Sequence, residues 1–570
     1  MSEMEIAAAL LPWLGLSFPG FCCLDPVSEP GGDPPPKLVV HITVDQLRGD
    51  VPVRMRHRFP PGGFRRLFDG LHYANAHFRH ATTYTAAGHA TLFTGADPRQ
   101  HGLVGNNWRD RRTGERVYCV EDPNYVWVGT STRKEHAGTS PANLLVNTYG
   151  DELVLSNGGR SRVFSVSIKD RGAILPAGRR GKAFWYDSQT GRFVSSTYYF
   201  ESLPSWAEEW NQAGKAEAYR DQAWELSRPR ASYLWGEQDD REAERPFRHM
   251  GKTFPHPLAG KEPQDLFAAL PFSPMGDALT LDFARELVRR ERLGSSDATD
   301  LLAISLSATD YIGHAWGPNS LEAEDQLLRL DRQLAALFDF LDREIGLSRI
   351  LIVLSADHGV DASPEFRNQS AGRTDLAGRH QPQQFLDVGN QALRKHFSLQ
   401  AEENLVVAFW NPGLYFDETR IRALKLNLKE AEDVVAKAVA SLPGIEVALS
   451  HHRLLAGEEQ TNPEVGMMAR SFHARRSGNV LLIQTPFWYL YHRPQRYAAM
   501  HGSPYRYDTH VPIFLLGPGI ASRTVYRRVG PESLAATLAG YLALPWPSAA
   551  DSTLLKEVFP AGNQSWLPDR

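Results

Sequence analysis

The sequence predicts an α/β fold with a doubly wound, mostly parallel central sheet flanked by helices and carrying inserted cap segments. Apolar runs rich in Val, Ile and Leu recur along the 570 residues, with helical patterns between them. The hydrophobic content of 42% is sufficient for a large core. Continuous apolar runs of strand length are typical of strands covered on both faces. Because strands and helices alternate along the whole chain, we expect one doubly wound domain.

Six runs have the length and composition of buried strands. They are Leu38–Val44, Arg162–Ile168, Leu301–Leu306, Ile350–Leu354, Val480–Gln484 and Pro512–Leu516. Apolar residues at helical spacing predict one helix over 279–288 and another over 327–345. Asn319 and Glu322 are expected to form a capping box at the start of the second helix.

The main domain is expected to span residues 37–560 and to contain two insertions. Residues 185–271 are dense in Trp, Tyr, Pro and charge and have little periodicity. Residues 368–475 combine strand-like and helix-like runs and predict a small α+β cap. A leader over 1–36 precedes the main domain, and a tail over 561–570 follows it.

The leader contains an apolar stretch, Ile6–Leu16, that is too short to cross a bilayer, which takes ~20 residues. Its length suits the apolar part of a secretory signal peptide. Against that, Glu3 and Glu5 precede it and no clear cleavage site follows. We expect export, to the periplasm in a bacterium, and a cytoplasmic location remains the alternative. No later stretch is long and apolar enough to predict a transmembrane span.

Charge and cysteine content exclude several classes of protein. The chain has 62 basic and 66 acidic residues and a net charge of −4, so no basic excess indicates a nucleic-acid-binding domain. Three cysteines cannot build a disulfide framework or a four-thiolate zinc site. We expect a soluble globular protein that recognises its ligand locally. A monomer is expected, with other oligomeric states left open.

Asp and His side chains follow several of the predicted strands. They are Asp45, Asp310, His314, Asp357, His358 and His501, with His510 as an alternative to His501. Each residue alone is more often a helix cap or part of a solvated loop. Ligands of open α/β sheets bind beyond the carboxyl ends of the strands, where these side chains could converge. Three Asp and three His suit Zn²⁺ or a similar ion. Six ligands suffice for two ions, an arrangement used for in-line displacement at phosphorus.

Thr85 is a candidate nucleophile at the predicted start of a helix, in the segment TYTAAGHATL. A hydroxyl there would lie beside free backbone N–H groups and the positive helix end, both favourable to a phosphoryl oxygen. The ordinary alternative is that Thr85 only caps the helix. His89 lies one turn later and is predicted to pack rather than to bind metal.

Two further groups of side chains could bind an anion. Lys169 and Arg171 lie two positions apart after a predicted strand, so an extended chain would direct both to one side. A solvated basic loop is the alternative. Asn106 and Asn107 lie in the run GNNW, where turn formation is the ordinary role of asparagine.

Taken in order, these motifs resemble the alkaline phosphatase superfamily. The motifs are D-Q-L-R-x-D, T-x-x-G-H-A-T-L-F-T-G, H-G-L-V-G-N-N-W, D-x-x-G-H, S-A-D-H-G and H-G-S-P-Y-x-Y-D-x-H-V-P, and they lie between Leu38 and Gly519. The sequence most resembles bacterial phosphate-irrepressible alkaline phosphatases that use a threonine nucleophile. That group is related to the type I phosphodiesterase/nucleotide pyrophosphatases.

The resemblance implies a role for each candidate side chain. One zinc ion would be held by Asp310, His314 and His501. The other would be held by Asp45, Asp357 and His358 and would also bind Thr85. Contacts to phosphoryl oxygens would come from Asn106, Lys169 and Arg171, and the segment around the two cations resembles the K-x-R-x-x-x-L-P-A-G motif of the monoesterase branch.

The implied activity is zinc-dependent hydrolysis of small-molecule phosphate monoesters through a covalent phosphothreonine, with release of inorganic phosphate. A phosphodiesterase/nucleotide pyrophosphatase of the same superfamily is the alternative, and it would replace the cations by a pocket for the second ester group. A catalytically silent binding module is the alternative from another class, but no predicted ligand is missing. Sulfatases need Cys or Ser in a C/S-x-P-x-R context, which TYTAAGH lacks.

Overall fold

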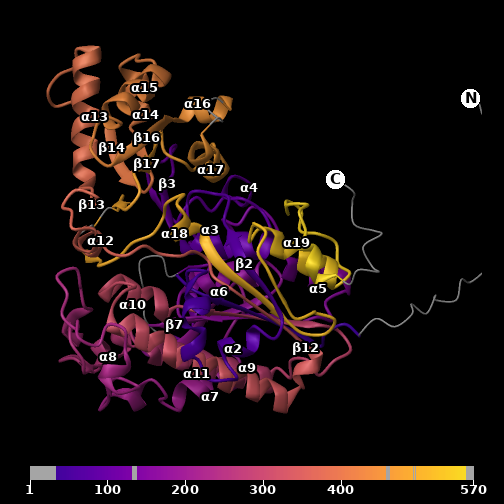
Figure 1. The fold of residues 1–570 in the computed structure, drawn as a ribbon. Helices are drawn as coiled ribbons and strands as arrows, with labels where there is room; N and C mark the ends of the chain where they lie inside the picture. The colour runs from indigo at the N-terminus through magenta and orange to yellow at the C-terminus, as the bar shows by residue number, and fades with distance from the viewer. Residues whose placement is uncertain (1–33, 131–137, 458–461, 492, 494–495, 560–570) are drawn as a thin grey trace, which may run out of the picture. The chain divides into compact units, whose positions relative to one another are not determined.

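The computed structural model describes residues 34–130, 138–457, 462–491, 493 and 496–559 (Figure 1). The predicted leader lies outside the described residues except for residues 34–36. The predicted tail lies outside them entirely. Within the described residues, no helix combines the length and the apolar character needed to cross a membrane.

A ten-stranded sheet forms the centre of the fold. Its strands, in order across the sheet, are β20 (Arg523–Val525), β2 (Leu71–His77), β19 (His510–Leu516), β12 (Ile350–Ser355), β1 (Leu38–Val44), β11 (Asp300–Leu306), β6 (Val163–Ser167), β7 (Lys182–Asp187), β8 (Arg192–Ser196) and β5 (Trp127–Val128). The central strands β12, β1, β11, β6 and β7 pair in parallel. Antiparallel pairs join β19 and β8 to this parallel core, so the sheet is mixed.

The sequence of the central strands explains their position. Every residue of β1, β11 and β12 is buried, as expected for strands that are covered on both faces. The predicted doubly wound α/β fold with a mostly parallel centre is therefore confirmed in this part of the sheet.

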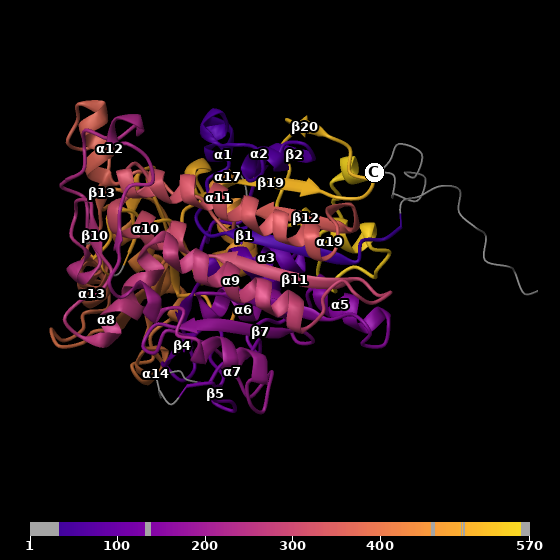
Figure 2. The ribbon, with the colours of Figure 1, turned by 90° about the horizontal axis from the view of Figure 1, so that it is seen from below.

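Helices cover the two faces of the sheet in separate groups (Figures 1 and 2). One group consists of α9 (Pro274–Arg290), α10 (Ala308–Trp316) and α11 (Leu321–Glu344). The other consists of α3 (Thr85–Thr94), α5 (Tyr149–Ser156), α6 (Asp170–Ala177) and α19 (Ser533–Tyr541). The helices predicted over 279–288 and 327–345 correspond to α9 and α11.

The predicted insertions differ from the observed elements at their edges. Both β7 and β8 belong to the central sheet, so the region from Trp185 first completes two sheet strands before it enters α7 (Ser205–Gln212) and irregular structure. The run Val480–Gln484 was expected to be a strand of the main sheet, and it forms β17 of a separate four-stranded sheet instead.

Three strands of this second sheet lie in the predicted cap, residues 368–475, and the fourth, β17, lies just beyond it. Its strands, in order, are β14 (Val406–Trp410), β15 (Gly413–Phe416), β17 (Val480–Gln484) and β16 (Ile445–Ser450). All of its pairings are antiparallel. Helices α13 (Pro382–Phe397) and α15 (Leu428–Val439) pack with it around a hydrophobic cluster of their own. The α+β character of this region agrees with the sequence prediction.

The start of α11 differs from the expected capping box. Ser320 is the N-cap, and its side chain accepts a hydrogen bond from the amide of Ala323 at 3.1 Å. The prediction that Asn319 and Glu322 form the box is therefore wrong. The Glu322 side chain is instead completely buried and contacts His256.

Candidate active site

The carboxyl ends of four adjacent parallel strands meet at one edge of the sheet. The strands are in register there, since Thr43 of β1 lies opposite Ser305 of β11 and Ser355 of β12. Beyond these ends lie Asp45, Asp357 and Lys169 in the connections after β1, β12 and β6, and Asp310 in the first turn of α10 after β11. This is the edge where open α/β sheets bind ligands.

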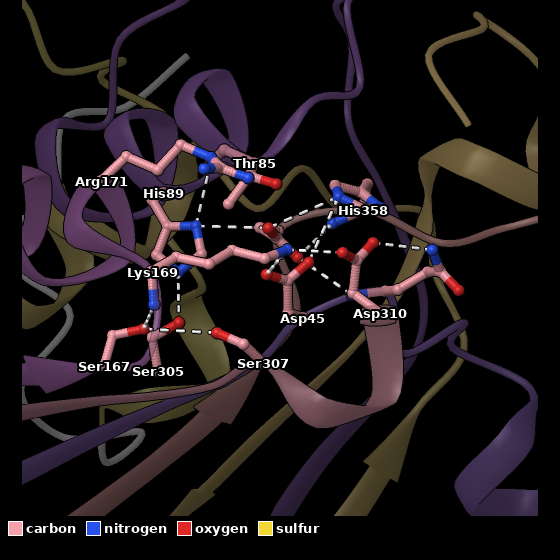
Figure 3. Close-up of polar contacts among 12 residues, drawn as sticks. Asp45, Thr85, His89, Ser167, Lys169, Arg171, Ser305, Ser307, Asp310 and His358 are labelled. Carbon is pink, nitrogen blue, oxygen red and sulfur yellow. Dashed lines mark hydrogen bonds and ion pairs between the residues drawn. The ribbon is translucent and has the colours of Figure 1, made fainter. Parts of the chain in front are cut away.

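Helix α3 brings Thr85 to the same place, and Thr85 is its first residue. All residues of α3 are buried. Gly88 lies so close to the loop after β12 that a β-carbon added to it would come within 2.0 Å of the backbone oxygen of Asp357. The glycine therefore permits α3 to approach the loop that carries Asp357 and His358. Figure 3 shows the Thr85 side chain directed toward the cluster of carboxylates.

The first predicted ligand set has its atoms close together. The Nε2 atoms of His314 and His501 lie 3.1 and 3.6 Å from Oδ1 of Asp310. One potential ligand atom from each of the three residues lies within 4.8 Å of the other two, so the three could hold one metal ion.

The second predicted set surrounds His358. Its Nε2 atom lies 3.5 Å from Oδ1 of Asp45 and 3.5 Å from Oδ2 of Asp357. These three atoms are buried, and each lacks a hydrogen-bond partner of good geometry. Asp310 also lies close to Asp45 and His358, and these three residues form a second group that could hold a metal ion. Asp310 therefore lies between the two predicted sets.

The three histidines are oriented by backbone carbonyls. Nδ1 of His314 contacts the oxygen of Ala499 at 2.7 Å, and Nδ1 of His501 contacts that of Thr83 at 2.7 Å. Nδ1 of His358 contacts its neighbour's carbonyl oxygen at 3.0 Å. A carbonyl can only accept, so each Nδ1 carries the proton and each Nε2 presents a lone pair to the site.

The donor types and spacings of these side chains suit a divalent metal ion such as zinc. Ligand atoms bound at ~2.0–2.2 Å in a tetrahedral site lie about 3.3–3.6 Å apart. Three of the separations within the two sets, at 3.5 to 3.6 Å, fall in that range, and the fourth, at 3.1 Å, is slightly shorter. Mixed imidazole and carboxylate donors are also the ligands that zinc accepts.

Lys169 lies between two of the carboxylates. Its Nζ donates hydrogen bonds to Oδ2 of Asp45 at 2.6 Å and to Oδ2 of Asp310 at 2.5 Å (Figure 3). Burial alone would lower the pKa of Lys169, but Asp310 and Asp45 outweigh burial and raise it. For Asp310 the direction is reversed. Burial alone would raise its pKa, but the neighbouring His314 and Lys169 hold this pKa well below its usual range. Burial and the neighbouring carboxylates raise the pKa of Asp45.

Residues 39–504 match the family model for type I phosphodiesterase/nucleotide pyrophosphatase. The chain belongs to this family. Two relatives are bacterial alkaline phosphatases. PhoV from Synechococcus elongatus is 34% identical and the match covers 92% of this chain and 93% of PhoV. PafA from Elizabethkingia meningoseptica is 32% identical, with coverage of 92% and 95%.

The crystal structure of wild-type alkaline phosphatase PafA superposes on this chain with a TM-score of 0.85. The match has 32% sequence identity and covers 93% of this chain and all of that structure. The resemblance to the bacterial alkaline phosphatases and the α/β fold are therefore confirmed. The chain is an enzyme of the alkaline phosphatase group within the type I phosphodiesterase/nucleotide pyrophosphatase family.

Asn106 and Asn107 are adjacent in the chain, and Asn106 is the one that contacts the start of α3. Its Oδ1 accepts a hydrogen bond from the amide of Ala86 at 3.0 Å, which turns its NH₂ group away from that amide. Asn107 instead accepts hydrogen bonds from Arg116 at 2.7 and 3.0 Å. The arrangement favours Asn106 over Asn107 as a donor to a ligand beside Thr85.

Arg171 lies in the first turn of α6, and in the view of Figure 3 its side chain extends in the direction of Thr85. The chain turns into a helix at Asp170, so the extended geometry expected for Lys169 and Arg171 is not observed. Both cations nevertheless point to the site. Arg171 donates to the hydroxyl of Tyr118 at 3.3 Å, while its buried Nε has no partner.

His510 lies away from the ligand groups. Its Nε2 contacts the backbone oxygen of Ala74 at 3.1 Å, and its ring stacks on His77 with centroids 4.6 Å apart. Both contacts hold β19 to β2. Among the described residues, the ligand groups include His501 and do not include His510.

Two residues of the site were not assigned a polar role from the sequence. His89 was predicted to pack, and it contacts the Thr85 carbonyl at 2.9 Å, Ser305 Oγ at 2.9 Å and Asp357 Oδ2 at 3.2 Å. Gln46 donates from Nε2 to Asp310 at 2.7 Å and from its backbone to Asp357 at 3.1 Å. Its φ of 70° is unusual for a non-glycine residue. The sequence did offer a sign of this role, because Gln46 directly follows Asp45 in the D-Q-L-R motif.

Proposed function

We propose that this enzyme hydrolyses small-molecule phosphate monoesters with two zinc ions and releases inorganic phosphate. The observation that carries the proposal is that Asp45 Oδ1 and His358 Nε2 are buried ligand atoms without hydrogen-bond partners. Asp357 Oδ2 lies 3.5 Å from the same His358 atom and has only the 3.2 Å contact with His89. Buried polar atoms without partners cost free energy, so a bound ion explains their retention. The relatives named as alkaline phosphatases support the choice of reaction.

In this proposal Thr85 is the nucleophile of a double displacement. The Thr85 hydroxyl gives up its proton to solvent water, its oxygen forms a bond to phosphorus in line with the ester oxygen, the P–O bond to the alcohol breaks, and the leaving oxygen takes up a proton from solvent water. Water then attacks the phosphothreonine, which restores Thr85 and releases phosphate. When bound, zinc ions would neutralise phosphoryl charge and lower the pKa of the attacking hydroxyl and water. The N-terminus of α3 adds a favourable dipole at the phosphoryl group.

Three side chains would grip the phosphoryl oxygens. Asn106 would donate from the NH₂ group that its bond to Ala86 turns outward. Arg171 retains unpaired N–H capacity at Nε and is the stronger candidate for direct contact. Lys169 is already paired with two carboxylates, so we assign it mainly to holding those ligands in place, with its remaining N–H available to substrate.

The charge of this site favours monoesters over diesters. A monoester carries more negative charge and more free oxygens than a diester, so it gains more from a neighbouring guanidinium. The family model also includes phosphodiesterases, which makes diester hydrolysis the second candidate function. Rates on chemically matched substrates distinguish the two.

The test compares kcat/KM for a matched aryl phosphate monoester and diester in zinc-loaded wild type, Arg171→Ala and Lys169→Ala. Wild type is expected to prefer the monoester. Arg171→Ala should lower the monoester rate by roughly ten- to a hundredfold and the diester rate by less. Arg180→Ala, which removes an exposed cation beyond the other end of α6, serves as control and should change neither rate. A wild-type preference for the diester would refute the proposed function.

A further inference from the structure

Gln46 contacts both of the predicted ligand sets, from the turn that directly follows β1 and Asp45. The residue is 2% exposed, and its Nε2 donates a hydrogen bond to Oδ1 of Asp310 at 2.7 Å. Its backbone N–H donates to Oδ1 of Asp357 at 3.1 Å. A single residue therefore holds one carboxylate of each set.

The backbone of Gln46 has a conformation that residues with a β-carbon rarely adopt. Its φ is 70°, in the left-handed region. This conformation costs free energy, and such residues concentrate at functional sites. A glycine would form the same turn without that cost, but it would lack the amide that contacts Asp310. The side chain is therefore what the protein gains from a glutamine at this position.

Both carboxylate oxygens of Asp310 are held by donors. Oδ1 accepts from Gln46, and Oδ2 accepts from Nζ of Lys169 at 2.5 Å. Oδ1 is also the oxygen that lies 3.1 and 3.6 Å from the Nε2 atoms of His314 and His501. The Gln46 amide thus fixes the oxygen that would share an ion with these two histidines. Because the amide is neutral, it orients this oxygen without cancelling its negative charge.

Helix α10 leaves space for the Gln46 amide at Gly313, the residue before His314. A β-carbon at Gly313 would come within 2.0 Å of Oε1 and 3.1 Å of Cδ of Gln46. These atoms are the end of a side chain, so an alanine would displace the amide from its place beside Asp310. Glycine is unfavourable inside a helix, and the amide that it accommodates explains its presence here.

We propose that Gln46 is a positioning residue for both metal sites, with its amide aligning Asp310 and its backbone N–H aligning Asp357. This role rests on the two-zinc site of the proposed function. Gln46 acts through the two carboxylates and is not itself a ligand. Hydrogen-bond partners of metal ligands commonly contribute about ten- to a hundredfold to metal affinity.

The test measures zinc bound per chain after the full-length protein is equilibrated with buffered free zinc at graded concentrations. Gln46→Ala is expected to release one of its two ions at a free zinc concentration about tenfold or more above that for wild type. The matched control is Gln326→Ala. Gln326 is also buried, and its Nε2 donates at 2.8 Å to Asp277, which lies outside the ligand groups of the described residues. The control should lose stability but release zinc like wild type.

A double-mutant cycle separates positioning from general destabilisation. Gly313→Ala should weaken zinc binding by a similar factor, because it displaces the Gln46 amide, even though alanine is the better helix former. Adding Gly313→Ala to Gln46→Ala should have little further effect, since no amide is left to displace. Additive losses, or a Gln46→Ala variant that holds both ions as tightly as wild type, overturn this role and leave the proposed function standing. Wild type that binds no zinc would overturn both.

Discussion

Each histidine of the proposed zinc sites is fixed by a hydrogen bond from Nδ1 to a backbone oxygen. These bonds leave Nε2 of His314, His358 and His501 facing the carboxylates. The backbone thus selects the tautomer that a metal ligand needs, before any ion binds. His510 has the opposite arrangement, because its Nε2 contacts a backbone oxygen.

We predict that His501→Ala loses about one zinc ion per chain, because only two ligands of its set would remain. His510→Ala is the matched control and should keep both ions, although loss of its stacking on His77 should lower stability. Elemental analysis after dialysis measures the zinc content. Full zinc in His501→Ala together with depleted zinc in His510→Ala would reassign the ligand.

Thr85→Ala should lower kcat/KM for a monoester by roughly 10³-fold or more, since it removes the proposed nucleophile. Its zinc content should remain that of wild type, because three protein ligands per ion are left. Thr85→Ser should keep part of the activity, since it retains the hydroxyl. An alanine variant that turns over as fast as wild type would exclude covalent catalysis by Thr85.

Sequence reasoning predicted the side chains that converge, but it could not predict their mutual contacts. Asp45, Asp310 and Asp357 could be found because each follows an apolar strand. Gln46 and His89 were not assigned polar roles, because their partners come from segments more than two hundred residues away. The pairing of Lys169 with two carboxylates was also missed, because these partners lie 124 and 141 residues away in the sequence.

At the scale of elements, the site depends on how closely α3 packs against the loop after β12. Gly88 makes this approach possible, since any β-carbon there would overlap the backbone oxygen of Asp357. The overlap is with backbone rather than with a flexible side chain, so the helix or the loop would have to move.

Gly88→Ala should therefore lower the free energy of unfolding by about 1–3 kcal/mol and reduce turnover by displacing Thr85 from Asp357. Gly466→Ala is the control, because it is also a helical glycine but has only the end of a flexible arginine within 4 Å. The control should be neutral or slightly stabilising. Chemical denaturation measures both; a Gly88→Ala variant with wild-type stability would contradict the proposed packing constraint.

The start of α11 illustrates why helix boundaries are hard to predict. Asn319 and Glu322 have the spacing of a capping box, but Ser320 one position later caps the helix equally well in sequence terms. The difference comes from tertiary structure, because Glu322 turns into the interior, where it contacts His256.

At the scale of the whole molecule, the pattern of apolar strands identified the α/β architecture but not the membership of each sheet. Val480–Gln484 has the same composition as the central strands, and it pairs with β15 and β16 in the cap. The amino-acid composition of a strand indicates that both of its faces are covered. Which sheet the strand joins depends on contacts between residues far apart in the sequence. The antiparallel pairing of β19 with β12 and of β8 with β7 was unpredictable for the same reason.

The proposed double displacement has one consequence that the complete enzyme reveals directly. All monoesters would pass through the same phosphothreonine, which then divides between water and any added alcohol. The decisive measurement is the ratio of transferred to free phosphate for several aryl phosphates with different leaving groups, at one concentration of acceptor alcohol. A ratio that is identical for every leaving group is predicted. A ratio that changes with the leaving group would contradict a common covalent intermediate and with it the role of Thr85.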